Sequence, residues 1–416
     1  MNPWLVLVIC FLLIIGFANI ALTEDDSVFI YGKVYARHNQ SYEGRLIWNN
    51  HETCWEDILN SKHRIRSKYT VKKSTKRVFG FLVEERGKRS LTTSLAIKFG
   101  HLKAIERRTQ NSAYLYVKDG RKIMVSGGGN DIGSNNRGII VEDPNEGPIK
   151  LTWNELDKVE FKAEPDWYVN DVALDDVYRL CARVHSCTGE VFEGALMWDN
   201  DETLSSHILD GKENGEDHKI EFGEISVLER DGTNGTIVKL RNGEVIRLTS
   251  SNDVNSGNRG IFVHDPSYGQ IQIPWRYFER LEFIDPTNYF LRKYNEFDGG
   301  IPLMGRVEDK NGEIVEGEIC WDDDECYSSD ILDGKYKYFT VRIEFANIRS
   351  IRRQSQQSAV VEFTDNKKLK LSGTNDVGVG NKGVVITTAT KRDQHINWRD
   401  LEEVEFRYLS NETGRM

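Results

Sequence analysis

The feature that most constrains this chain is a set of landmarks that occurs three times. A loop that begins with Asn-Asp and ends with a basic residue and Gly occurs in three copies, at separations of 122 and 123 residues. A Trp and then a Phe follow each loop at the same separations. A fixed period of this kind indicates that one structural unit is repeated along the chain. The landmarks are Asn130, Asn252 and Asn375, then Trp153, Trp275 and Trp398, then Phe161, Phe283 and Phe406.

Each copy also opens alike, with "YEGRLIWNNHE", "FEGALMWDNDE" and "VEGEICWDDDE" around Trp48, Trp198 and Trp321. Six of the nine tryptophans therefore stand at repeated positions. We predict three tandem homologous domains at 24–165, 166–290 and 291–410, preceded by a separate segment at 1–23 and followed by a tail at 411–416.

The pattern within a copy predicts an all-β fold. "TIVKLRNGEVIRLT" alternates apolar and polar residues on both sides of Asn242-Gly243, which favours a β-hairpin. The matching positions hold Asp119-Gly120 and Asp365-Asn366, residue types that tolerate the left-handed backbone. Helical signals are short, as in "WRYFERLEF". At about 120 residues each, the copies fit small β-barrel or β-sandwich domains with short helical turns, or two packed five-strand units each.

Residues 305–325, "GRVEDKNGEIVEGEICWDDDE", give a strand, a turn, a second strand with Gly and an acidic turn. The later "VVEFTDNKKLKLSG" at 360–373 follows the same order. Over about 20 residues at a time, these segments resemble the start of SH3/Sm-like small β-barrels. The resemblance implies a bent-strand barrel and no specific activity.

The first 23 residues differ from the rest of the chain, because Trp4–Leu22 contains no charged residue. This segment fits a secretory signal peptide or, alternatively, an N-terminal transmembrane anchor. We therefore expect an exported protein: periplasmic, secreted or at the cell surface. The net charge of −10 argues against nucleic acid as a partner of the whole surface.

The first copy differs from the other two by an insertion. Trp48 and Phe99 are 51 residues apart, whereas the equivalent pairs, Trp198–Phe222 and Trp321–Phe345, are 24 apart, so about 27 residues are added within roughly 61–95. This segment is basic, and we predict either that it contacts an anionic partner or that it docks on an acidic turn of copy 2 or 3. The basic residues are Lys62, Arg64, Arg66, Lys68, Lys72, Lys73, Lys76 and Arg77.

The Asn-Asp loop has two interpretations. Its side chains offer oxygens to Ca²⁺ or donors to an anion, but Asn and Asp also form Asx turns, and the shared set holds only one carboxylate. We favour a structural role for this loop. The residues concerned are Asn130 and Asp131, Asn252 and Asp253, and Asn375 and Asp376, followed in copy 2 by Asn258 and Arg259.

The acidic turns after the first repeated Trp can hold a divalent cation, or they can simply be solvated turns that cap a short helix. No cofactor is required by the sequence, but Ca²⁺ is the candidate cation. Copy 1 reads "WNNHE" and keeps only Glu52 of the acidic set. The candidate metal ligands are Asp199, Asp201, Glu202, Asp322, Asp324 and Glu325.

The repeated tryptophans suit a hydrophobic core, with sugar stacking as the alternative. Trp55 occurs in copy 1 alone and is expected to be freer to be exposed. The five cysteines outside the first segment include no Cys-x-x-Cys pair, so neither a disulfide framework nor a cysteine zinc site is expected. A local Cys181–Cys187 or Cys320–Cys326 bond remains open.

The sequence contains none of the common catalytic motifs, such as G-x-S-x-G, H-E-x-x-H or a P-loop. We therefore predict a non-enzymatic binding or scaffolding protein, with a protein, a glycan or an anionic membrane surface as its partner. The alternatives are a carbohydrate-binding or carbohydrate-active protein that uses the Trp and carboxylate positions, and a calcium-stabilised repeat protein.

Overall fold

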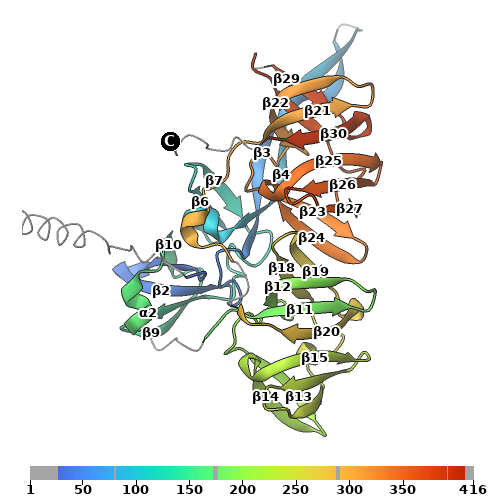
Figure 1. Cartoon of the computed structure of the whole chain (residues 1–416). Helices are drawn as coiled ribbons and strands as arrows, with labels where there is room; N and C mark the ends of the chain where they lie inside the picture. Colours follow the sequence, from blue (N-terminus) through green and yellow to red (C-terminus); the bar gives the residue numbers. More distant parts are fainter. Residues whose placement is uncertain (1–26, 79–80, 172–176, 287–290, 391, 408–416) are drawn as a thin grey trace, which may run out of the picture.

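The computed structural model of the chain describes residues 27–78, 81–171, 177–286, 291–390 and 392–407, without the side chains of 66–91 and 169–171. The N-terminal segment at 1–23 and the tail at 411–416 lie outside the described residues. The molecule is nearly all β, as predicted (Figure 1), with 56% of residues in strands and a single α-helix, α2 (Asp166–Asp171), among the residues described.

The strands fall into three sets of ten, which we call units 1, 2 and 3. Unit 1 contains β1 (Tyr31–Ala36), β2 (Gln40–Trp48), β3 (Ile58–Val78), β4 (Phe81–Lys98), β5 (Leu102–Thr109), β6 (Ser112–Val117), β7 (Lys122–Ser126), β8 (Ile139–Asp143), β9 (Gly147–Leu151) and β10 (Leu156–Phe161). Unit 2 contains β11 (Cys181–Ser186), β12 (Val191–Met197), β13 (Ile208–Glu213), β14 (Glu216–Glu221), β15 (Ile225–Asp231), β16 (Gly235–Leu240), β17 (Val245–Thr249), β18 (Ile261–Asp265), β19 (Gly269–Ile273) and β20 (Phe278–Phe283). Unit 3 contains β21 (Met304–Asp309), β22 (Ile314–Trp321), β23 (Ile331–Tyr336), β24 (Phe339–Glu344), β25 (Ile348–Ser355), β26 (Ser358–Phe363), β27 (Lys368–Ser372), β28 (Val384–Thr387), β29 (Asp393–Ile396) and β30 (Leu401–Phe406).

The three units share one antiparallel pairing pattern. In unit 1 the spatial order is β4-β3-β7-β6-β5-β10-β1-β2-β8-β9. The same pairs recur in unit 2, where β11 pairs with β12 and β20, and β12 pairs with β18. They recur again in unit 3, where β21 pairs with β22 and β30, and β22 pairs with β28. The residue that ends β2, β12 or β22 is therefore always brought beside the start of the strand that follows the Asn-Asp loop.

Units 2 and 3 are joined by a pairing that crosses the boundary between them. Strand β19 of unit 2 pairs with β24 of unit 3, with Gln270 opposite Arg342 and Gln272 opposite Thr340. The two units consequently share one 20-stranded sheet and one hydrophobic core, whereas unit 1 has its own sheet and core.

The cores are built around aromatic side chains. Trp48, Trp198 and Trp321 are fully buried, and each meets the second repeated Trp of its unit at a ring-centroid distance of 6.0 to 6.4 Å. A buried aromatic side chain removes about 150–250 Å² from water, so these pairs dominate the packing of each unit. The core of unit 1 also takes in Tyr294 and Phe297, which come from the segment before unit 3.

The turns follow from residue types that tolerate positive φ. Gly243 has φ +92°, and Asn366, at the equivalent hairpin of unit 3, has φ +67°. Several of the short helical elements are single 3₁₀ turns, for example η5 (Trp275–Tyr277), η9 (Trp398–Asp400) and η4 (Asn252–Val254). Among the residues described, no helix is long and apolar enough to cross a membrane.

The insertion of unit 1 forms a long β-hairpin. Strands β3 and β4 contain 21 and 18 residues, whereas the equivalent strands of units 2 and 3 contain six each. The hairpin leaves unit 1 beside β7 and runs past β29 of unit 3 (Figure 1). The side chains of Arg66, Lys68, Lys72, Lys73, Lys76 and Arg77 lie outside the described part, while Lys62 and Arg64 are exposed.

One of the two possible local disulfides is present. Cys320 and Cys326 are bonded, whereas Cys181 and Cys187 are free thiols, buried and exposed respectively. Cys54 is free and buried.

Candidate functional site

The acidic turn and the Asn-Asp loop, which the sequence presents as two motifs, meet in space. In unit 2 the indole Nε1 of Trp198 donates a hydrogen bond to the carbonyl oxygen of Asp253 at 2.9 Å. The same bond joins the equivalent residues of the other units, at 2.9 Å in unit 1 and 3.0 Å in unit 3. Each unit therefore has one polar centre, formed where β2, β12 or β22 ends.

The first turn residue after the Trp is held in the left-handed region, with φ +52° at Asn49, +49° at Asp199 and +46° at Asp322. Asn and Asp tolerate this conformation better than other residues with side chains, which explains their choice here. The Asp199 carboxylate is fully buried and accepts bonds from the backbone N–H and the guanidinium of Arg259. It therefore ties the acidic turn to the end of the Asn-Asp loop.

The loop aspartate is also held by the fold. The Asp253 carboxylate accepts a hydrogen bond at 2.9 Å from the backbone N–H of Asp210, which lies in β13. Asn258 accepts the N–H of Gly260 at 2.9 Å, which is an Asx turn. Local contacts thus account for much of the conformation of this loop.

The glutamate that ends each turn has less support. Oε2 of Glu52, Glu202 and Glu325 is buried and finds no hydrogen-bond donor among the described residues. One ligand atom from each of Asp199, Glu202 and Asp253 lies within 4.8 Å of the others, and Asp322, Asp324 and Glu325 form the equivalent group in unit 3. A third group consists of His51, Glu52 and Asp131. Copy 1 keeps only Glu52 of the acidic turn residues. The structure adds His51 from the same turn and Asp131 from the Asn-Asp loop to this group.

Burial and mutual repulsion make these carboxyls hard to ionise. Burial, followed by the charge of Asp253, raises the pKa of Glu202 to about 9. Burial likewise raises the pKa of Asp324 to about 7. The pKa of Glu52 is raised well above its usual range by burial and by Asp131. Each centre therefore favours added positive charge, either a proton or a cation.

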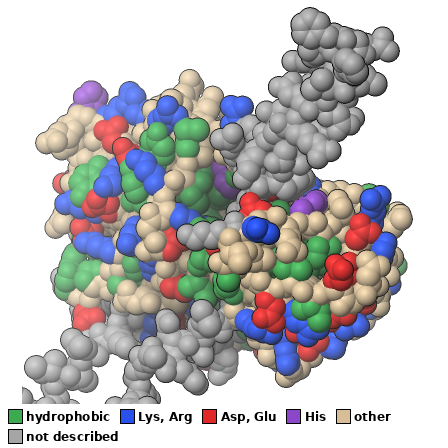
Figure 2. Space-filling view, turned by 90° about the horizontal axis from the view of Figure 1, so that it is seen from above, with side chains coloured by type: hydrophobic (Ala, Val, Ile, Leu, Met, Phe, Trp, Pro, Cys, Tyr) green, Lys and Arg blue, Asp and Glu red, His purple; other side chains and the backbone are tan. Residues whose placement is uncertain are grey.

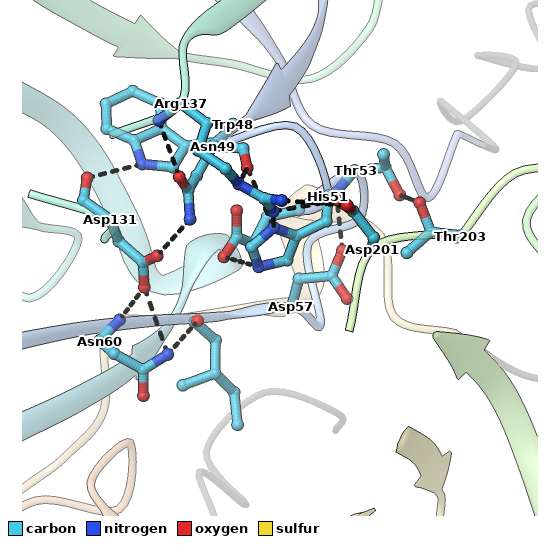
Figure 3. A network of polar contacts seen from close by, with 12 residues as sticks. Trp48, Asn49, His51, Thr53, Asp57, Asn60, Asp131, Arg137, Asp201 and Thr203 are labelled. Carbon is cyan, nitrogen blue, oxygen red and sulfur yellow. Dashed lines mark hydrogen bonds and ion pairs between the residues drawn. The ribbon is translucent and has the colours of Figure 1, made fainter. Parts of the chain in front are cut away.

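A basic side chain lies at each centre, and in unit 1 it reaches the neighbouring unit (Figure 3). Arg137 donates to the Asn49 carbonyl at 3.1 Å and to Asp201 of unit 2 at 3.0 Å. Arg259 contacts the same Asp201 carboxylate at 3.2 Å. Asp201 thus belongs to the junction between units rather than to the three-ligand group of unit 2.

The base of the long hairpin covers the acidic centre of unit 3. A cavity of about 340 Å³ lies between Thr92–Ala96 of β4 and the carboxylates of unit 3. The residues of the hairpin that line this cavity are His63 and small side chains rather than the lysines and arginines, so this contact is not the docking of the basic residues that the sequence offered as one of two alternatives. The carboxylates that line the cavity are Asp324, Glu325, Asp330, Asp333 and Asp376.

The six repeated tryptophans are buried, at most 5% exposed, so their rings are not available as sugar-stacking platforms. Trp55 is also buried, which corrects the expectation that it is freer to be exposed. It packs against Tyr294 with a ring-centroid distance of 4.5 Å, because the segment before unit 3 closes the core of unit 1. That segment is remote in sequence, which is why the single occurrence of Trp55 was misleading.

The sequence contains a signal that the acidic turn and the Asn-Asp loop form one polar centre. The signal is the spacing between the two motifs, compared from copy to copy. Trp and loop Asp are separated by 55 residues in units 2 and 3 and by 83 in unit 1, and the insertion of about 27 residues accounts for nearly all of this difference. His51 carried no such signal, because the other copies have Asp at that position.

On the surface in view in Figure 2, Lys and Arg side chains are interspersed with Asp and Glu over both lobes of the described structure.

Comparison of the chain with protein-family models and with curated protein sequences gives no match, so the interpretation of the site rests on the chemistry of its own residues.

Proposed function

We propose that this chain is an exported, non-enzymatic binding protein built of three homologous β units, and that hairpin β3–β4 of unit 1 binds anionic lipid head groups. The observation that carries the proposal is the length of this hairpin, which far exceeds that of its counterparts in units 2 and 3. The three units supply the scaffold that holds it.

The charge of the hairpin favours an anionic partner. Residues 61–78 include eight Lys and Arg residues and no acidic residue, in a chain of net charge −10. The strand register places Lys72 opposite Arg86. Like charges in opposite positions destabilise a hairpin unless an anion lies between them.

A lipid surface fits this sequence better than other polyanions. The hairpin ends its first strand at Val78 and resumes with Phe81, Leu82 and Val83, so apolar residues stand close to Lys76 and Arg77. Basic residues near an anionic bilayer contribute about 1 kcal/mol each, and apolar residues add burial in the interface. An uncleaved N-terminal anchor, one of the two expectations for residues 1–23, would also hold the chain at a membrane.

The test is vesicle flotation of the full chain with phosphatidylcholine alone and with added phosphatidylserine. We expect binding that depends on phosphatidylserine, falls with salt and is lost when Lys72, Lys73, Lys76 and Arg77 are changed to Gln. The matched control changes Lys212, Lys239, Lys310 and Lys368 to Gln and keeps the binding. Equal binding by both variants contradicts the proposal, and binding to heparin without binding to these vesicles would assign the hairpin to an acidic polysaccharide.

The second candidate function is stabilisation by Ca²⁺ at the carboxylate groups of units 2 and 3. The unsupported Oε2 atoms of Glu202 and Glu325 favour it. A chelator should then lower the Tm, added Ca²⁺ should restore it, and the double variant Glu202→Gln, Glu325→Gln should abolish the response. A Tm that is insensitive to chelator excludes this role. Asp322→Ala is a poor test, because Asp322 also accepts a hydrogen bond from Asn375.

A further inference from the structure

The polar centre of unit 1 differs in chemistry from the other two. His51, Glu52 and Asp131 each place one ligand atom within 4.8 Å of the others. All three residues are buried, with exposures of 8%, 2% and 4%. A neutral imidazole nitrogen and two carboxylates, drawn from a turn and a loop that are far apart in sequence, are the ligand types of a divalent metal site.

Two of these three side chains are oriented by further hydrogen bonds (Figure 3). His51 Nδ1 accepts a hydrogen bond from the guanidinium of Arg137 and lies 3.0 Å from the Asn49 carbonyl oxygen. The neutral ring therefore carries its proton on Nε2, which lies 2.8 Å from Glu52 Oε1. The Asp131 carboxylate accepts bonds from Asn49 Nδ2 at 3.0 Å and from the backbone N–H of Asn60 at 2.6 Å. Contacts of this kind fix the direction of metal ligands.

Glu52 is the side chain that points to a missing partner. Its Oε1 lies 2.8 Å from His51 Nε2, while its Oε2 is buried and finds no donor among the residues described. The nearby cation, Arg137, contacts His51 on the Nδ1 side and is engaged by Asn49 and Asp201. A carboxyl group buried beside a second carboxylate either holds a proton or requires a cation close to its own oxygens.

We propose that His51 Nε2, Glu52 and Asp131 form a divalent metal site that takes Zn²⁺ in preference to Ca²⁺. Calcium prefers about six to eight oxygen ligands, whereas three ligands including an imidazole suit zinc with a water at its fourth position. A metal on Nε2 takes the place of the proton on that nitrogen, and the neutral imidazole then carries its proton on Nδ1, which donates to the Asn49 carbonyl oxygen. Arg137 gives up its contact with Nδ1 and keeps its contact with Asp201. Units 2 and 3 have Asp201 and Asp324 in place of the histidine.

The test is calorimetric titration of Zn²⁺ into the full chain in a buffer that contains excess Ca²⁺. We expect one site whose affinity falls at least about tenfold in His51→Asn and in Glu52→Gln. The matched control is Glu202→Gln, which changes the equivalent glutamate of unit 2 and should leave this affinity unchanged. Thermal melting of each variant checks that it is folded.

A second measurement keeps the proposal open to refutation if one variant misfolds. Bound Co²⁺ should give visible d–d absorption in the unaltered chain, and Zn²⁺ should displace it while Ca²⁺ should not. His51→Asp, which copies the turn of unit 2, should lose the preference for Zn²⁺. Equal Zn²⁺ affinity in His51→Asn and the unaltered chain overturns the proposal. So does a folded chain that binds no Zn²⁺, since Glu52 and Asp131 would then share a proton instead.

Discussion

The Nζ atom of Lys98 lies 2.7 Å from Oε2 of Glu344, and this buried ion pair joins unit 1 to unit 3. Lys98 also contacts Glu56 at 2.7 Å, and Arg292 contacts both carboxylates at 2.6 Å. His101 completes the group, 2.8 Å from Glu344. The network balances two carboxylates against two cations, and the side chains of Lys98 and Glu344 within it are only 8% and 1% exposed.

Removal of one cation from this network should be costly. Lys98→Met leaves Glu344, whose side chain is 1% exposed, without one of its charge partners, and we expect a loss of about 3–5 kcal/mol in the free energy of unfolding. Urea denaturation measures the change. Lys310→Met is the control, because its pair with Asp400 is exposed and should contribute less than about 1 kcal/mol. Equal losses in both variants would show that the buried network does not hold the units together.

The same network predicts a dependence of stability on acid. Burial alone would raise the pKa of Glu56, but the charges of Lys98 and Arg292 lower it to about 2. A carboxyl whose folded pKa is depressed stabilises the protein above its unfolded pKa of 4.5, and this contribution is lost as the pH falls towards 2. Denaturation midpoints measured from pH 6 down to about pH 3 should therefore fall more steeply for the unaltered chain than for Glu56→Gln. Parallel slopes would contradict the assignment.

The indole bond of the repeated Trp is testable in a single unit. Trp198→Phe removes the donor at Nε1 and leaves the buried Asp253 carbonyl without it, which should cost about 1–3 kcal/mol. Trp167→Phe is the control, because Trp167 is 48% exposed and its replacement should change stability by less than about 0.5 kcal/mol. Both values come from denaturant unfolding. A neutral Trp198→Phe would mean that the ring, rather than its N–H, fixes the loop.

The glycine that ends the Asn-Asp loop should tolerate no side chain. Gly383 has φ +97°, and a Cβ there would overlap the carbonyl oxygen of Ile396, so Gly383→Ala carries both backbone strain and a clash. Gly189 has φ +90° with open space around it, so Gly189→Ala carries the strain alone, about 1–2 kcal/mol. We expect Gly383→Ala to lower the Tm by clearly more than Gly189→Ala does. If the two variants melt together, the loop can shift to admit the methyl group.

The sequence predicts the local structure of this chain well, because alternation and turn chemistry are properties of adjacent residues. Gly243 and Asn366 fall at positive φ, as their hairpins require. The strand pairings and ion pairs between units cannot be predicted in this way. Period-two alternation assigns each strand a buried face but does not name the strand that it pairs with, so the β19–β24 pairing has no counterpart in the sequence pattern. The Lys98–Glu344 pair spans 246 residues and is equally invisible.

The polar centres also combine motifs that the sequence shows with contacts that depend on the fold. The motifs themselves were evident, and the candidate ligands Glu202 and Glu325 lie in them. Their convergence depends on the pairing of β2 with β8 and its equivalents, which places a turn beside a loop more than 50 residues away. The sequence gives no signal for His51, because comparison among the copies highlights residues that recur, and this one does not.

The packing of Tyr294 and Phe297 into unit 1 has a consequence for biosynthesis. The single O–H of Tyr294 is shared between the carbonyl oxygens of Leu102 and Phe161, at 3.0 and 3.1 Å, and Gly100 lies directly against Phe297. N-terminal domains commonly fold while the ribosome is still making the rest of the chain. Unit 1 cannot complete its core in this way, since two of its aromatic residues emerge only after all of unit 2 has been translated. The first part of the polypeptide to leave the ribosome is therefore among the last to reach its final packing.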